Sequence, residues 1–190
     1  MNSRTASRPA TALDDIVDDP VFGEYHHGVA DAPIDAVWNA LTTTTWADLR
    51  LLRTLWRIRS PLSTPNAGLP FMETLSSHAV TVADPPRTLL FALVGRPWSP
   101  VAPHVAECHT VDEIRAFDEP GWLVYGMEWR LTALDERRTL LETRTHCRPT
   151  STAARIAFTL YWTAIRAGSG LIRRDMIATV ARRSVARPGS

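Results

Sequence analysis

The sequence predicts an α+β fold, with a curved antiparallel sheet packed against one long C-terminal helix and two short helices after the first strand. Several strand-like runs follow one another between residues 71 and 148 without crossover helices, which is typical of an antiparallel sheet. After Pro149 the hydrophobic period becomes that of a helix and stays so almost to the C-terminus. The chain has 190 residues, enough for one domain with a core of its own.

Residues 1–20 are expected to be a flexible tail, because no apolar period runs through them. A weakly alternating strand is predicted at Val21–Asp31. A helix should follow Pro33 and end at the β-branched run Thr42–Thr45. The apolar residues of this helix recur at helical spacing and comprise Ile34, Val37, Trp38 and Leu41.

A second helix is predicted from about Trp46 to Arg59. Its apolar stripe comprises Leu49, Leu52, Leu55 and Trp56. Three arginines share a different face of this helix, namely Arg50, Arg53 and Arg57.

The central part of the chain reads as a series of strands. Phe71–Val82 and Arg87–Gly95 are separated by a proline turn, and the second run is apolar enough to be a central strand. Trp98–Thr110 contains two prolines, which suits an edge strand or an irregular segment. Trp122–Leu134 and Arg138–Arg148 are expected to form a hairpin closed by a three-residue loop.

The terminal helix should begin at a cap among residues 150–152. Gly168-Ser169-Gly170 is expected to bend or interrupt it. The residues expected to face the core from its first half are Ile156, Leu160, Tyr161, Ala164 and Ile165. Residues 21–184 are thus predicted to form a single domain, and residues 185–190 a C-terminal tail.

Composition excludes several classes of function. The formal net charge is +1, so the broad positive field of a dedicated nucleic-acid binder is absent. All 21 cationic residues are arginine, which rules out Schiff-base and lysine-dependent phosphate chemistry. The cysteines Cys108 and Cys147 are expected to be free thiols in a cytoplasmic protein. Neither a secretory signal nor stable membrane insertion is expected from the hydropathy of the chain.

The predicted hairpin places four charged residues on one side of the sheet. With the three-residue loop, Glu128 faces Arg144 and Arg130 faces Glu142. These residues lie either on a solvated face or in a cavity, where Glu142 and Arg144 would orient a polar group of a ligand.

Clusters of metal-ligating or nucleophilic residues give weak signals. His104, Glu107, Cys108 and His109 lie close in sequence, but on a strand they would divide between two faces, so no metal is expected. Ser169 lies outside any nucleophile-elbow pattern. No cofactor is expected, because no glycine-rich motif follows a strand in dinucleotide-binding order.

Several segments resemble the START-like, polyketide-cyclase-related superfamily (SRPBCC), in particular an uncharacterised bacterial subgroup. They are HGVADAPIDAVWNALT (27–42), DPPRTLLFALVGRPW (84–98), FDEPG (117–121), LLETRT (140–145) and LYWTAIRAGSGLIRRDM (160–176). The resemblance implies a helix-grip fold, an incomplete antiparallel barrel around a C-terminal helix with a hydrophobic cavity between them. Members bind lipids, polyketides and other apolar molecules, and some catalyse cyclisation or dehydration.

The first functional hypothesis is therefore the binding of a small, lipid- or polyketide-like molecule between the sheet and the terminal helix. Thr143 and Thr145 would tether its polar groups. The expected apolar walls are Trp38, Phe91, Leu93, Trp98, Tyr125, Met127, Trp129, Tyr161 and Trp162.

Two alternatives stay open. An enzyme of the cyclase or dehydratase type would use His78, Tyr125 or Glu142 as proton donor or acceptor. A regulatory module would act through the arginine-rich terminal helix, whose basic residues otherwise form a solvated face; they include Arg173, Arg174, Arg182 and Arg183. An apolar small molecule is the expected partner, nucleic acid is not, and the sequence leaves open whether the chain forms a homodimer.

Overall fold

The computed structural model describes residues 12–59, 65–99 and 105–185. Across these residues one antiparallel sheet is formed, in the order β1-β5-β4-β3-β2. Its strands are β1 (Phe22–Ala30), β2 (Val80–Asp84), β3 (Thr88–Gly95), β4 (Leu123–Ala133) and β5 (Thr139–Pro149). The helices are α1 (Ala12–Ile16), α2 (Ile34–Thr43), α3 (Arg50–Arg59), α4 (Phe71–Ser76), α5 (Val111–Ala116) and α6 (Thr152–Val185).

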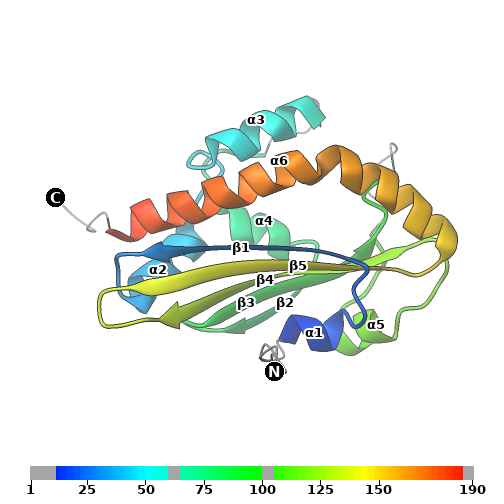
Figure 1. Ribbon diagram of the computed structural model, residues 1–190, viewed down its shortest axis with the longest axis horizontal. Helices are drawn as coiled ribbons and strands as arrows, with labels where there is room; N and C mark the ends of the chain where they lie inside the picture. The colour runs from blue at the N-terminus through cyan, green and yellow to red at the C-terminus, as the bar shows by residue number, and fades with distance from the viewer. Residues whose placement is uncertain (1–11, 60–64, 100–104, 186–190) are drawn as a thin grey trace, which may run out of the picture.

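Helices cover both faces of the sheet (Figure 1). On one face, α2, α4 and α6 enclose the largest core cluster. On the opposite face, α1 and α5 cover a second cluster. α3 lies on the outside of α6, where Leu55 comes within 3.9 Å of the position that a Cβ on Gly168 would take. The chain therefore has the predicted α+β, helix-grip architecture, with an open curved sheet and a long C-terminal helix.

The β4–β5 hairpin has the predicted register. Glu128 pairs with Arg144 and Arg130 pairs with Glu142 across the ladder. Because strand side chains alternate, the register also fixes which residues of both strands face α6. Those residues are Leu123, Tyr125, Met127, Trp129, Leu131, Leu141, Thr143, Thr145 and Cys147.

The terminal helix is uninterrupted. The Ser151 hydroxyl accepts a hydrogen bond from the backbone N–H of Ala154 and caps the helix as expected. Gly168 and Gly170 lie within the helix and do not interrupt it. Between them, the Ser169 hydroxyl donates a hydrogen bond to Glu24 on β1 at 2.9 Å, so this part of α6 is fixed to the sheet.

The predicted core-facing stripe of α6 was wrong in part. Ile156 and Leu160 are 60% and 71% exposed, whereas Ala154 and Phe158 are buried against the sheet. The first half of α6 is apolar on more than one side, so its hydrophobic period does not by itself identify the buried face.

The predicted strand at 71–82 was also wrong in its first half. Pro70 precedes α4, and Phe71 and Met72 are buried in the main core cluster. The Phe71 ring packs against the Trp46 indole with 5.1 Å between centroids, so a tertiary contact favours the helical turn.

The chain near the N-terminus is structured earlier than predicted. Residues 12–16 form α1, and Leu13, Ile16 and Val17 are buried under the sheet. Residues 12–17 are therefore not a tail, because their apolar side chains cover the face that also carries α5. The remainder of the predicted tails, residues 1–11 and 186–190, lies outside the described residues.

Candidate functional site

An arginine side chain lies between the sheet and α6, near the middle of the helix. Arg173 donates hydrogen bonds to Thr143 Oγ1 at 3.3 Å and to Thr145 Oγ1 at 3.0 Å, and it contacts the Met127 sulfur. These contacts join α6 to β4 and β5. All three partners are neutral, and among the described residues no carboxylate forms a direct ion pair with Arg173.

The surroundings of Arg173 disfavour its charge. The residue keeps part of its surface accessible, but protein atoms surround the guanidinium closely. Desolvation by these atoms lowers the pKa of Arg173 from its ordinary value to about 10, although the negative charge of Glu24 opposes the shift. A guanidinium with so low a pKa is an unusual feature that an anionic group in the site would stabilise.

Glu24 provides the second polar element of the interface. It accepts the hydrogen bond from Ser169, and one of its carboxylate oxygens lies 3.7 Å from His26 Nε2. Glu24 and His26 occupy alternate positions on β1, so both face α6. The polar groups therefore form a band across the sheet. Arg173 reaches it from α6 above β4 and β5, and Glu24 belongs to β1.

An aromatic cluster adjoins this band toward the N-terminal end of α6. Phe158 is buried at its centre, 4.9 Å from Phe22 between ring centroids. Four partly buried aromatic residues surround it, namely Trp98, Tyr125, Tyr161 and Trp162. Together they form an apolar surface that retains some exposure to solvent.

Cys147 links the aromatic cluster to Arg173. The thiol is buried in the cluster, and burial raises its pKa to about 12 against the opposing charge of Arg173. Cys147 is the next residue after Thr145 on the same face of β5, and Thr145 accepts a hydrogen bond from Arg173, so the cation lies close to the cluster. A ligand at this point could contact apolar rings and a positive charge at once.

The predicted wall residues divide between two places. One group belongs to the aromatic cluster and comprises Trp98, Tyr125, Tyr161 and Trp162. The other group packs in or against the main core cluster and comprises Trp38, Phe91, Met127 and Trp129. In that group Trp129 is fully buried and Phe91 is 3% exposed. Leu93, which is half-buried, pairs with Tyr125 across β3 and β4.

The three candidate catalytic residues are not brought together. His78 is exposed in the turn after α4, not on a strand. Glu142 faces away from α6 and accepts a hydrogen bond from Tyr25 at 2.6 Å. Tyr125 lies in the aromatic cluster on the other face.

The charged quartet lies on the face opposite α6, but it is not uniformly solvated. Glu128 and Arg144 are only 2% and 7% exposed. Arg130 and Glu142 retain more exposure. Alternation along the two strands correctly predicted that all four residues share one side of the sheet. The tertiary packing decided which side that is and how deeply each charge is buried.

Arg173 is the candidate site residue that sequence reasoning misplaced, since it was grouped with a solvated arginine face. The helical period contained the signal, because Ser169, Arg173, Met176, Ile177 and Val180 share one face at spacings of three and four. Met176, Ile177 and Val180 are all buried. The neighbouring Arg174 is exposed, as expected for the basic face.

The described residues contain neither a metal centre nor a membrane-spanning helix. No group of three or more metal-ligating side chains lies close enough to hold an ion. His104, part of the candidate cluster weighed above, falls outside the described residues. No described helix is long and apolar enough to cross a bilayer.

Comparisons with known proteins match this chain only to solved structures. No family model and no curated protein matches the sequence. A hypothetical protein from Helicobacter pylori has a TM-score of 0.39 and 13% identity, with 94% of this chain and 98% of that chain covered.

Two similar structures have named activities. The Zhui aromatase/cyclase from a Streptomyces species has a TM-score of 0.34 and 14% identity over 89% of this chain and 99% of that chain. Norcoclaurine synthase from Thalictrum flavum, in complex with dopamine and hydroxybenzaldehyde, has a TM-score of 0.36 and 10% identity, and both chains are fully covered. At these identities and TM-scores the similarity carries no conclusion about this chain, and any function has to be argued from the site itself.

Proposed function

We propose that this protein binds a small, mostly apolar molecule with an acidic or strongly polar end, between the sheet and α6. The aromatic cluster contacts the apolar body of the ligand, and Arg173 binds the polar end. Thr143 and Thr145 hold the guanidinium in place. The resemblance of the sequence to the START-like superfamily and the helix-grip fold support the same proposal, including membership of that superfamily.

The observation that carries the proposal is the position of Arg173. A desolvated cation is costly, and its neutral partners compensate that cost only in part. An anionic group would supply the missing countercharge through two parallel hydrogen bonds, which guanidinium geometry favours. The adjacent rings would then contribute apolar burial at about 25 cal/mol per Å² before ordering costs.

A cyclase or dehydratase activity gains no specific support. Of the candidate proton donors and acceptors, Tyr125 borders the proposed site, whereas His78 and Glu142 lie elsewhere. The site as described contains groups that bind and orient a ligand.

Two fluorescent probes of similar shape test the proposal. Anilinonaphthalene sulfonate carries an anionic group, and phenylnaphthylamine is neutral. Arg173→Met should weaken binding of the anionic probe about ten-fold, since a charge-assisted hydrogen bond is lost, and should leave the neutral probe unaffected. Arg174→Met, a change on the exposed neighbour, should leave both affinities unchanged.

The aromatic part of the site has its own matched pair. Trp162→Leu should weaken both probes, whereas Trp122→Leu, on the opposite face of the sheet, should weaken neither. Cooperative unfolding and an unchanged near-ultraviolet circular dichroism spectrum show that each variant is folded. Equal affinity of the anionic probe for the native protein and for folded Arg173→Met would overturn the proposal.

A further inference from the structure

A second region of the molecule gathers arginines from two helices that are far apart in sequence. Two adjoining clefts, with volumes of about 400 and 420 Å³, together form what we call the α3–α6 cleft. The first lies between the start of α3 and the C-terminal part of α6, and the second is lined by Ala47 and by residues of α3. They share Ala47 and Arg50 as lining residues. The arginines that line them are Arg50, Arg53, Arg57, Arg182 and Arg183.

No acidic side chain in the described part of the chain forms an ion pair with the arginines of α3. Arg50, Arg53 and Arg57 follow one another at spacings of three and four, so they share one face of the helix. Among the described residues none of them has an ion pair or a hydrogen bond through its side chain. Like charges on neighbouring turns of a helix repel one another, so this face gains stability when an anion binds.

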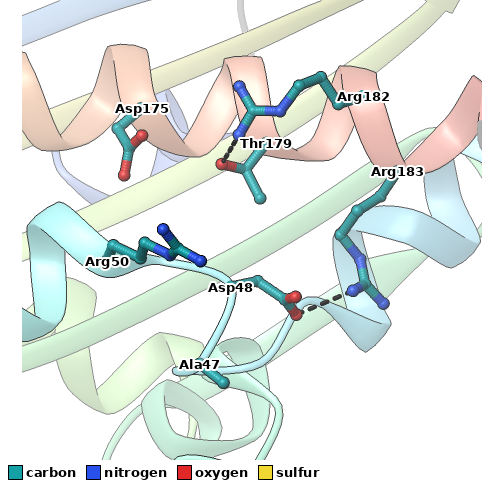
Figure 2. Close-up of a pocket in the computed structure, with 7 residues that line it drawn as sticks. All are labelled: Ala47, Asp48, Arg50, Asp175, Thr179, Arg182 and Arg183. Atoms are coloured by element: carbon teal, nitrogen blue, oxygen red, sulfur yellow. Dashed lines mark hydrogen bonds and ion pairs between the residues drawn. The ribbon is translucent and has the colours of Figure 1, made fainter.

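The arginines of α6 are held in place by the protein. Arg183 forms an ion pair with Asp48 at 2.9 Å, and Arg182 donates a hydrogen bond to Thr179 at 2.8 Å (Figure 2). Asp48 and Asp175 are the acidic residues of the lining, so positive charge remains in excess.

Asp175 adds a hydrogen-bond acceptor to this basic cleft. One of its carboxylate oxygens is buried and has no hydrogen-bond partner among the described residues. Figure 2 shows Asp175 on α6 facing the cleft, with Arg50 on the α3 side. A buried acceptor without a partner is costly, and a hydroxyl or amino group of a ligand would satisfy it.

We propose that the α3–α6 cleft binds a small molecule that carries two or more phosphate charges together with a hydroxyl or amino donor. Guanidinium groups bind phosphate oxygens through paired hydrogen bonds, and a concave wall concentrates their field on an anion. The volume of each cleft lies within the range of small-molecule sites. The site is separate from the Arg173 site, which lies under α6 and not between the two helices.

Isothermal titration with inorganic pyrophosphate tests the phosphate part. The native protein should bind it, with an affinity that falls as salt rises, because exposed charges are screened. Arg50→Gln and Arg53→Gln should each weaken binding about ten-fold. The matched control is Arg155→Gln, which removes the same charge from an exposed position at the other end of α6 and should leave the affinity within about two-fold.

The acidic residue gives a test of opposite sign. Asp175→Asn should tighten pyrophosphate binding several-fold, because it removes a repulsive charge from the cleft. Its control is Glu136→Gln in the exposed β4–β5 turn, which should change little. Adenosine diphosphate offers the ribose hydroxyls as donors, so its binding should tighten less than that of pyrophosphate in Asp175→Asn. Equal tightening for both probes would overturn the role given to Asp175.

Phosphate can also be presented by a lipid headgroup, and vesicles distinguish that source. Vesicles of phosphatidylcholine mixed with an anionic lipid should not sediment the native protein, and they should not compete with pyrophosphate for binding to it. If sedimentation depends on Arg50 and Arg53 while pyrophosphate does not bind, the small-molecule proposal is overturned in favour of a membrane surface. Absence of pyrophosphate binding to folded native protein, or an equal effect of Arg155→Gln, also overturns it.

Discussion

Arg173 on α6 and Thr145 on β5 face each other across the helix–sheet interface, where the guanidinium Nη2 donates a hydrogen bond to the threonine hydroxyl at 3.0 Å. The contact places a cation near Cys147 and the aromatic rings, in surroundings whose desolvation lowers the pKa of Arg173. A ligand with an acidic end would counteract that shift by stabilising the charged form.

Raising the pH through about 10 should weaken binding of the anionic probe, because desolvation lowers the pKa of Arg173 in the folded protein to about 10. An arginine with its ordinary pKa would stay charged across this range. Titrations of native protein, Arg174→Met and Arg173→Met measure the effect. The first two should lose affinity as the pH rises, and Arg173→Met should be flat over the same range.

The lowered pKa of Arg173 should also make the stability of the ligand-free protein depend on pH. Above about pH 10 the unfolded chain holds the Arg173 proton more tightly than the folded protein does, so the free energy of unfolding rises with pH until the unfolded chain also loses that proton. Arg173→Met should remove that dependence and change the free energy of unfolding by less than about 1 kcal/mol at neutral pH. A loss of several kcal/mol at neutral pH would make Arg173 a structural residue.

Trp129→Ala should lower the free energy of unfolding by about 3–5 kcal/mol, because its side chain is fully buried in the main core cluster. Trp162→Ala, at a partly exposed position in the aromatic cluster, should cost less. Urea denaturation measures both. If Trp129→Ala lost little stability but much probe binding, the ligand site would lie at the main core cluster and not at the aromatic cluster.

Gly168→Ala should stabilise the protein by about 0.5–1 kcal/mol, because alanine has the higher helix propensity and α6 is continuous at this position. The nearest atom to the added Cβ, Leu55 Cδ1, would lie at 3.9 Å, which is an ordinary contact. Gly28→Ala is the contrasting variant, since its Cβ would come within 2.6 Å of Ile177 on α6 and should destabilise. Destabilisation by Gly168→Ala in thermal unfolding would show that α6 needs a break there.

Asp48→Asn should cost about 1 kcal/mol of stability at neutral pH, and less in acid. Burial opposes ionisation of Asp48, but hydrogen bonds from Thr45 and the charge of Arg183 outweigh it and lower its pKa. Its stabilising effect is therefore complete above the ordinary pKa of 3.8 and is lost as the pH falls through the lower folded value. Denaturation of native protein and variant at several acid pH values should show the two curves converging.

Local signals in the sequence were enough to predict the hairpin and the helix cap. The loop at residues 135–137 and the period of two place Glu128 opposite Arg144, and Ser151 offers the hydroxyl that caps α6. The cap depends on residues three positions apart, and the register of the hairpin depends on the length of the loop that joins its strands. The same is true of the end of α2 at Thr43, where β-branched residues follow one another.

Where the sequence prediction failed, a distant contact decided the structure. Phe71 lies in a helix because Trp46 and the core receive its ring. Leu13 is buried because Gly126 has no side chain on the face of the sheet that α1 covers. A Cβ at Gly126 would lie only 2.7 Å from Leu13 Cδ1. Ile156 points outward because Phe158 takes the inner side of α6.

The sequence by itself determined the α+β class, the antiparallel order of the hairpin, the long terminal helix and the apolar character of its surroundings, because periodicity and turn chemistry are local properties. Only the tertiary structure decided that Arg173 lies against Thr143 and Thr145 while Arg174 meets solvent, and that Arg50 of α3 lines one cleft with Arg182 and Arg183 of α6. A charge acquires its role from the elements that pack around it, and the order of residues along the chain does not specify which elements those are.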